Sequence, residues 1–454
     1  MTSSPASLGS LCEPLRQDTR STLDKARQLQ RALYRAAKAS PARRFHVLYD
    51  KMYRKDVLAK AWREVKANAG SAGVDGQTIE QIEQQGVEGL LIELAAELRE
   101  GRYRPHAVRR VRIPKPDGSQ RGLGIPAVRD RIVQAAAKTV LEPIFEADFR
   151  PSSYGFRPKR SAHQAGEQLR QAVNRGANWI VELDIEAFYD RIDHDLLMKL
   201  VEKRVCDRPM LKLLRQWLKA SVLDGGELLP SEQGVPQGGV VSCVLANVVL
   251  HELDRVWEDR CSQLGQLIRY ADDAVVLCRT EAQAREALWR IGVVLGRLKL
   301  KLHPTKTQVV YVGNGRQGFD FLGFHCRKLE SWKYRGYRYL QRWPGRRAMQ
   351  RIRNKIKVIT APRHRLPEPV GPIVAEVNQA LRGWGAYFRV GNSSPKFAQV
   401  DDYVRERLAL FLSKKSGRHG RNFERYTYAY FKRLGVYRLV GTVTRYTAAP
   451  IAAR

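Results

Sequence analysis

The sequence predicts an α+β fold in which helical ends flank a central region of short strands. Apolar residues recur at helical spacing in the first hundred positions and again in the last quarter of the chain. Between these regions, short apolar runs bounded by turn residues are typical of buried strands. At 454 residues and 43% hydrophobic content, the chain exceeds what one core usually serves. We therefore expect two or three packed domains.

The first hundred residues predict a helical extension that carries no recognisable chemistry. The apolar residues that share a helix face there are Leu29, Leu33 and Ala36, and then Val87, Leu90, Leu91, Leu94 and Leu98. A basic block follows. Its segment 108–113 predicts a strand and Pro116-Asp117-Gly118 predicts a turn, so we expect a hairpin whose side chains reach towards phosphates.

Three segments in the middle of the chain carry polar residues next to buried strands. Residues 179–185 predict a strand with Asp184 at its end, and the turn 234–239 precedes a helix whose apolar stripe runs from Val241 to Val256. Segments 267–270 and 274–278 predict a hairpin with Asp272 and Asp273 at its tip.

The last quarter of the chain predicts a small helical bundle with basic outer faces. Its three apolar stripes are Met349/Ile352/Ile356/Ile359, Val374/Val377/Leu381/Trp384/Phe388 and Val400/Val404/Leu408/Leu412. On these patterns, we expect a division into residues 1–100, 101–178, 179–330 and 331–454.

Positive charge predicts a polyanionic partner. The chain holds 80 Lys and Arg against 46 Asp and Glu, a net charge of +34, and residues 327–454 contribute 29 of these cations against 7 acids. In the run 332–339, basic residues alternate with aromatic ones, which suits phosphate pairing and stacking on unpaired bases. The alternative is a solvated charged face.

Cysteine spacing and hydropathy exclude several classes of protein. The six cysteines form no C-x-x-C pair, so neither a zinc module nor a disulfide framework is indicated. The longest apolar stretch, 240–250, contains Ser242 and Asn247 and is too short to span a bilayer, and no leader opens the chain. We expect a soluble, cytoplasmic protein with no membrane partner.

The three aspartates predict a site for two magnesium ions. Carboxylates at a hairpin tip and at a neighbouring strand end can gather the hard cations that in-line phosphoryl transfer requires. An Asp-Asp dipeptide alone is more often a solvated turn. Arg269 is also a possible internal counter-ion, which would make Asp272 and Asp273 a structural ion pair.

Residues 270–273, Tyr-Ala-Asp-Asp, resemble the signature of reverse transcriptases, and the surrounding blocks resemble group II intron-encoded proteins of the bacterial type that lacks a C-terminal endonuclease. The blocks in family order are 113–118, 123–126, 129–134, 153–158, 184–194, 234–242, 302–307 and 321–324, with 381–388 resembling the thumb or maturase segment. The resemblance implies a right-hand polymerase with an N-terminal extension, fingers, a ferredoxin-like palm and an α-helical thumb/maturase domain.

The resemblance also implies roles for individual residues. Asp184, Asp272, Asp273 and the carbonyl of Ile185 match the ligands of two Mg²⁺ ions, with Mn²⁺ as a possible substitute. Lys115, Arg121, Tyr189 and Gln237 match the residues around the incoming nucleotide, and Tyr189 would exclude a 2′-hydroxyl. Lys306 matches either a proton donor to pyrophosphate or a phosphate contact. The cations expected to grip RNA are Arg346, Arg347, Arg351, Arg353, Lys355 and Lys357.

These roles have plainer alternatives. Tyr189 can be a packing aromatic, Lys115 and Arg121 can merely solvate a hairpin, and His194 and His303 are expected to orient turns. Many relatives have Pro where this chain has Cys243, and we expect that change to adjust only the start of the following helix.

The resemblance favours an intron-encoded reverse transcriptase that copies structured group II intron RNA, extends a DNA primer or target with deoxynucleoside triphosphates and assists splicing. The alternatives are a splicing cofactor with a relic palm and a domesticated reverse transcriptase of a defence or CRISPR locus. No Cys/His-rich endonuclease module follows the thumb in the sequence, and the oligomeric state stays open.

Overall fold

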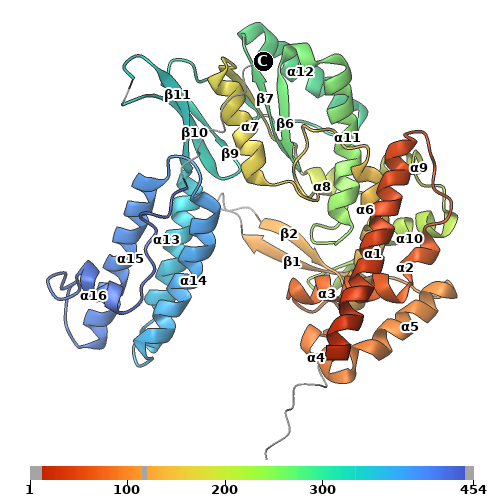
Figure 1. Ribbon diagram of the computed structural model, residues 1–454, viewed down its shortest axis with the longest axis horizontal. Coiled ribbons are helices and arrows are strands. Elements are labelled where there is room, and N and C mark those ends of the chain that lie inside the picture. The colour runs from red at the N-terminus through yellow and green to blue at the C-terminus, as the bar shows by residue number, and fades with distance from the viewer. Residues whose placement is uncertain (1–12, 115–119, 333, 445–454) are drawn as a thin grey trace, which may run out of the picture.

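Short β-sheets at the centre of the computed structural model separate two helical regions (Figure 1). The structure describes residues 13–114, 120–332 and 334–444, with side chains described from residue 22 onward. The mixture of helices with antiparallel sheets confirms the α+β prediction. None of the helices in these ranges combines the length and the apolar composition that crossing a bilayer requires.

The N-terminal region is helical, as predicted, and continues into a hairpin. Its elements are α1 (Glu13–Ala39), α2 (Tyr49–Met52), α3 (Lys55–Ala67), α4 (Ile79–Gln85), α5 (Val87–Arg99), β1 (Val108–Pro114), β2 (Gln120–Ile125) and α6 (Val128–Glu146). Capping boxes begin α4 at Thr78 and the later helix α7 (Ala162–Asn174) at Ser161. The β1–β2 hairpin matches the prediction, whereas its predicted turn at 116–118 lies outside the described residues.

The region expected to form the palm holds a four-stranded antiparallel sheet in the order β6-β7-β3-β8. Its elements are β3 (Trp179–Leu183), α8 (Phe188–Arg191), α9 (His194–Glu202), α10 (Arg208–Leu218), α11 (Ser242–Arg260), η1 (Ser262–Leu264), β6 (Gln266–Tyr270), β7 (Asp273–Cys278), α12 (Glu281–Arg297) and β8 (Gln308–Tyr311). Helices separate β3 from β6 and β7 from β8. This βαββαβ order is that of a ferredoxin-like sheet, as expected.

Alternating side chains of the palm strands belong to two different hydrophobic cores. Val181 and Val276 pack with the N-terminal helices, α11 and α12. Ile180 and Val275 pack on the opposite face with α7 and the C-terminal helices. Because successive strand residues point to opposite faces, the strand that ends at Asp184 is held from both sides.

Two further sheets lie outside the palm. The short strands β4 (Val222–Asp224) and β5 (Glu227–Leu229) extend the β1–β2 hairpin, with β1 parallel to β4. The strands β9 (Gly318–Phe321), β10 (Phe324–Glu330) and β11 (Arg338–Pro344) form an antiparallel sheet. Sequence reasoning identified neither β10 nor β11 as a strand.

The C-terminal helices are α13 (Arg346–Thr360), η2 (Arg363–Arg365), α14 (Val370–Phe388), α15 (Ser394–Lys415) and α16 (Tyr428–Arg433). The first three long helices coincide with the three predicted apolar stripes. The boundary expected between positions 330 and 331 falls inside the β10–β11 hairpin, which a domain boundary would not divide. We propose instead that the C-terminal domain begins at Gly345, and we keep the other divisions as proposals.

Candidate nucleotidyl-transfer site

The two adjacent aspartates lie at the tip of the β6–β7 hairpin. Tyr270 pairs with Asp273, which leaves Ala271 and Asp272 as a two-residue turn. Ala271 has a φ of +57°, a left-handed conformation that is uncommon for a residue with a Cβ. Asp272 therefore occupies the turn itself, whereas Asp273 is already the first residue of β7.

The third aspartate lies beside this tip, because Leu183 at the end of β3 pairs with Ala274 of β7. Asp184 is the residue that follows β3, and it lies beside Asp273, the first residue of β7. The backbone N–H of His303 donates to the Asp184 carbonyl over 2.7 Å. Ile185 and Leu302 form an isolated β-bridge. The hydrogen bonds of this bridge are made by the residues on either side of each partner, and the Ile185 carbonyl is not an acceptor in them.

Burial and mutual repulsion raise the pKa values of the hairpin carboxyl groups. The pKa of Asp273 rises to about 6, chiefly through desolvation and then through the charges of Asp272 and Asp184. The pKa of Asp272 rises for the same leading reason, with Asp184 adding to the effect. The Asp273 residue is nevertheless exposed, so its carboxyl group remains accessible to a cation from solvent. A bound cation would relieve this repulsion.

The donor chemistry of the three aspartates fits a hard divalent cation, because every side-chain donor is a carboxylate oxygen. Within the described ranges, however, no three His, Cys, Asp or Glu side chains converge closely enough to enclose a metal ion by themselves. The aspartates interact through their charges without forming a closed coordination shell.

Two cations lie close to the aspartates. The Lys306 ammonium is 3.6 Å from Asp184 Oδ2, with both side chains partly exposed, so this ion pair is weak and easily exchanged. The positive charge of Arg121 on β2 lowers the pKa values of Asp272 and Asp273 and so offsets part of their repulsion. Lys115, the other predicted triphosphate ligand, lies outside the described residues.

Arg121 also contacts the glycine-rich loop, since its guanidinium donates to the side-chain carbonyl of Gln237. The loop backbone is attached to the same strand: the Gly124 N–H donates to the Gln237 carbonyl over 2.7 Å. Gly238 has a φ of +118°, and a Cβ there would lie 2.4 Å from the Gly124 carbonyl oxygen. Glycine is therefore required at this point of contact between the fingers hairpin and the loop.

Tyr189 is buried on α8, where the N–H of Val235 donates to its carbonyl over 2.7 Å. Desolvation raises the pKa of its hydroxyl far above the usual range, and Asp272 adds to the effect. The fold thus brings Tyr189, Arg121, Gln237 and Lys306 to the three aspartates. His194 orients a turn, as expected, because its Nε2 lies 2.7 Å from the Gly234 carbonyl.

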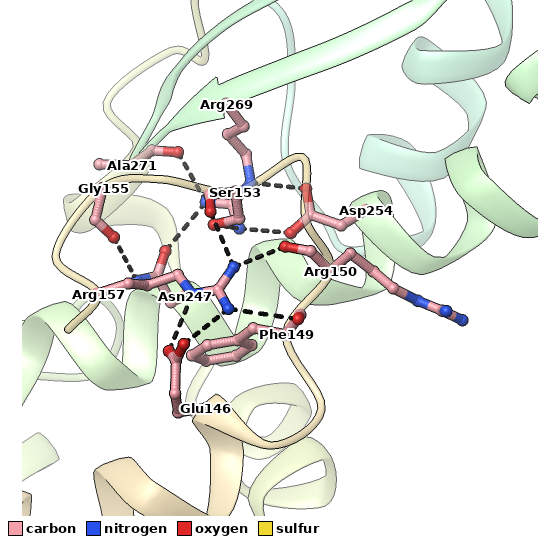
Figure 2. A network of polar contacts seen from close by, with 10 residues as sticks. All are labelled: Glu146, Phe149, Arg150, Ser153, Gly155, Arg157, Asn247, Asp254, Arg269 and Ala271. Atoms are coloured by element: carbon pink, nitrogen blue, oxygen red, sulfur yellow. Dashed lines mark hydrogen bonds and ion pairs between the residues drawn. The ribbon is translucent and has the colours of Figure 1, made fainter. Parts of the chain in front are cut away.

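A buried arginine holds the aspartate turn from behind (Figure 2). Arg269 forms a two-point ion pair with Asp254 of α11, at 2.8 Å and 2.5 Å, and both side chains are almost fully buried. The same guanidinium donates to the Ala271 carbonyl, to the Asn247 side chain and to Ser153 Oγ, at 2.9 Å, 3.0 Å and 2.8 Å. The hypothesis that Arg269 is the counter-ion of Asp272 and Asp273 was therefore wrong.

The loop containing Ser153 lies directly against the aspartate turn. A Cβ on Gly155 would lie 2.3 Å from the Ala271 nitrogen, and Asn247 donates to the Gly155 carbonyl over 2.9 Å. Arg157 continues the network behind the loop, with a two-point ion pair to Glu146 and bonds to the carbonyls of Arg150 and Ser153 (Figure 2). Sequence reasoning missed the supporting roles of Asn247 and Asp254, although these polar residues interrupt the apolar stripe of α11.

Two family models match the chain. Residues 113–326 match "Reverse transcriptase (RNA-dependent DNA polymerase)", and residues 349–431 match "Group II intron, maturase-specific domain". Protein YkfC of Escherichia coli is 35% identical over 342 residues, which cover 67% of this chain and 89% of YkfC. The chain belongs to the group II intron reverse transcriptases.

Other relatives match over smaller parts. The group II intron-encoded protein LtrA of Lactococcus lactis is 35% identical over 214 residues, 46% of this chain and only 35% of LtrA. A Schizosaccharomyces pombe protein described as "Uncharacterized 91 kDa protein in cob intron" is 27% identical over 80% of this chain and 54% of that protein. As an enzyme, this reverse transcriptase is an RNA-directed DNA polymerase.

The maturase segment of this reverse transcriptase presents cations on α13. Arg346, Arg347, Arg351, Lys355 and Lys357 are exposed, while Ile352 and Ile356 face the core. Arg353 differs, because it is half-buried with its guanidinium 6.0 Å from the centre of the Tyr403 ring. Five of the six predicted RNA-binding cations thus lie on the open side of the helix, and Arg353 packs against α15.

Replacing Arg269 with Met should destabilise the reverse transcriptase by about 3–5 kcal/mol, because the Asp254 carboxylate would stay buried without a partner. Urea unfolding monitored by circular dichroism would measure the loss, with the exposed Arg260→Met as the control on α11. Should Arg269→Met not fold, Ser153→Ala removes one hydrogen bond of the network and should cost about 1 kcal/mol. Unfolding midpoints equal to the control for both variants would contradict the structural role.

Replacing Asp273 with Asn should stabilise the metal-free protein above pH 6. The folded-state pKa of Asp273 is raised to about 6, so ionisation in the folded state is disfavoured and stability falls as pH rises from about 4 towards 6. Asn removes this cost. Thermal unfolding in EDTA should show a higher midpoint for Asp273→Asn at pH 8 and a smaller difference at pH 5. An equal difference at both pH values would contradict the repulsion.

Proposed function

We propose that this reverse transcriptase extends a DNA primer on an RNA template with two divalent cations, Mg²⁺ or alternatively Mn²⁺, held by Asp184, Asp272, Asp273 and the carbonyl of Ile185. The observation that supports the proposal is that β3 and the β6–β7 hairpin bring three carboxylates to the same end of one sheet, where the charge of Asp184 raises the pKa values of Asp272 and Asp273. When bound, such ions activate the attacking hydroxyl and neutralise the charge that develops on the triphosphate.

The chain's own side chains would position the incoming deoxynucleoside triphosphate. Arg121 is held by Gln237 in front of the carboxylates and can grip two phosphate oxygens. The ion pair of Lys306 with Asp184 is weak, so the Lys306 ammonium can contact the pyrophosphate instead. It would act there either as a proton donor or as a phosphate ligand. We propose Lys115 as a second cation that binds the triphosphate. This proposal rests only on the position of Lys115 in the sequence.

We propose that Tyr189 excludes ribonucleotides. Its ring is fixed by burial and by the loop that follows at Val235, so it cannot turn aside for a 2′-hydroxyl. The raised pKa keeps its own hydroxyl protonated, which avoids a further negative charge beside Asp272.

The RNA partner we propose is structured group II intron RNA, which the exposed cations of α13 and the neighbouring basic helices would grip at its phosphates. The maturase-specific match over residues 349–431 supports a role in intron splicing and mobility, with a DNA target as primer. Because the chain matches only 35% of LtrA, these wider activities rest on the matched segments alone.

Replacing Asp272 with Asn should abolish primer extension, with a rate loss of about a thousandfold or more, since a cation ligand contributes several kcal/mol to the transition state. The assay would supply an RNA template, an annealed DNA primer, deoxyribonucleotides and Mg²⁺. Asp195→Asn on α9 makes the same charge change at an exposed position and should stay within about twofold of the native rate.

Two outcomes would contradict the proposal in different ways. Extension that survives Asp272→Asn would overturn the assignment of the site. An inactive native protein that still bound intron RNA in a salt-sensitive manner would favour a splicing cofactor with little polymerase activity.

Replacing Tyr189 with Val should lower the preference for deoxyribonucleotides over ribonucleotides by about tenfold or more, because the steric barrier disappears. Tyr189→Phe keeps the ring and should keep the preference. Single-nucleotide incorporation with paired deoxy and ribo substrates would measure the ratio. An unchanged ratio in the folded Val variant would mean that Tyr189 only packs.

A further inference from the structure

A cavity of about 300 Å³ opens among the C-terminal helices, between α15 and the chain from α16 to residue 438. Its polar lining consists of Asp401 and Arg405 from α15, and of Tyr428, Lys432, Tyr437 and Arg438 from the later segment. The residues that we assign to the polymerase site are not part of it. Its volume is at the lower end of the range for small-ligand sites, which suits one nucleotide-sized group.

Aromatic rings and guanidinium groups alternate from the lining residues Arg438, Tyr428 and Arg405 to Phe423, which lies outside the cavity lining. The Arg405 guanidinium lies 4.7 Å from the centre of the Phe423 ring and 4.5 Å from that of Tyr428. Arg438 contacts the Tyr428 ring in turn, at 5.2 Å. The Tyr428 hydroxyl donates to Asp402, which fixes the orientation of the ring. Such a stack presents flat surfaces on which another planar group can lie.

The cavity carries unbalanced positive charge. Asp401 is its one acidic lining residue, and the backbone N–H groups of Leu439 and Val440 donate to that carboxylate at 2.9 Å each. Arg438 lies 3.8 Å from Asp401, too far for a hydrogen bond. The Nε of Arg405 is buried and has no hydrogen-bond partner in the described part of the chain. The lining therefore holds three cationic side chains, Arg405, Lys432 and Arg438, against one carboxylate.

We propose that the cavity binds one unpaired nucleotide of an RNA, with its base stacked on the tyrosine rings and its phosphate between Arg405, Lys432 and Arg438. Unpaired RNA bases are commonly held in this way, by stacking on aromatic or arginine planes together with pairing of the phosphate. The inference rests on the proposed binding of RNA by this domain. It adds a defined site to what the cations of α13 provide by charge alone.

The test is photo-crosslinking to a short RNA of random sequence in which every uridine is 5-bromouridine, with the adducts mapped by mass spectrometry. We expect adducts on Tyr428 or Tyr437 of the full chain. The double variant Lys432→Ala/Arg438→Ala should lower their yield about tenfold, since it removes phosphate contacts beside the stack. The control Lys414→Ala/Arg433→Ala removes the same two charges from exposed positions on α15 and α16 outside the cavity.

Three results would overturn the proposal: no adduct on either tyrosine, equal losses in the two double variants, or displacement of the RNA by uridine monophosphate at equal nucleotide concentration. The last result would identify a free nucleotide as the ligand. Primer extension on an unstructured template tests the polymerase separately, so a failure of this site is distinguishable from a failure of the proposed function.

Discussion

The buried pair of Arg269 and Asp254 fixes the position of the β6–β7 hairpin that carries Asp272 and Asp273. One guanidinium joins strand β6, helix α11, the loop at Ser153 and the carbonyl of Ala271 in the aspartate turn. A charge buried without its partner costs several kcal/mol, so these pieces are stable only when all of them are in place. The unusual backbone of Ala271 can persist because this network determines it from several directions.

Because Arg269 pairs with Asp254, it is not available as an ion-pair partner for Asp272 and Asp273. The positive charge that acts most on Asp272 and Asp273 is that of Arg121, with Arg269 making a smaller contribution at Asp272. The result is a concentrated negative centre in a chain with a net charge of +34. The two signs suit two partners: the basic surface attracts a polyanion over long distances, while the acidic centre attracts small cations. A nucleic acid alone would be repelled from the carboxylates, and divalent cations would reverse that repulsion.

Sequence reasoning succeeded where apolar patterns were uninterrupted. The strands around Asp184 and Asp273 and the three C-terminal helices follow simple periodicities, and the resemblance supplied the order of the blocks. It failed at β10 and β11, where Lys328 and Arg342 are buried at inward positions. Lys328 is satisfied by the side chain of Asn178, and Arg342 lies over the Phe324 ring near Glu167. These partners are distant in the sequence, so the sequence pattern does not show that the two cations are buried. A strand that contains such a cation therefore has the pattern of a polar segment.

The two hydrophobic cores connect the C-terminal helices to the aspartates. Neighbouring residues of β3 belong to different cores, so the strand that ends at Asp184 packs against the N-terminal helices on one face and shares the other core with the maturase helices. Helix α14 is also attached to the β9–β10 turn and to α7, because the Tyr387 hydroxyl donates to the Leu322 carbonyl and the Tyr387 carbonyl contacts His163 of α7. An RNA bound by the C-terminal helices would therefore keep a fixed position relative to the aspartates, because closely packed protein interiors have low compressibility.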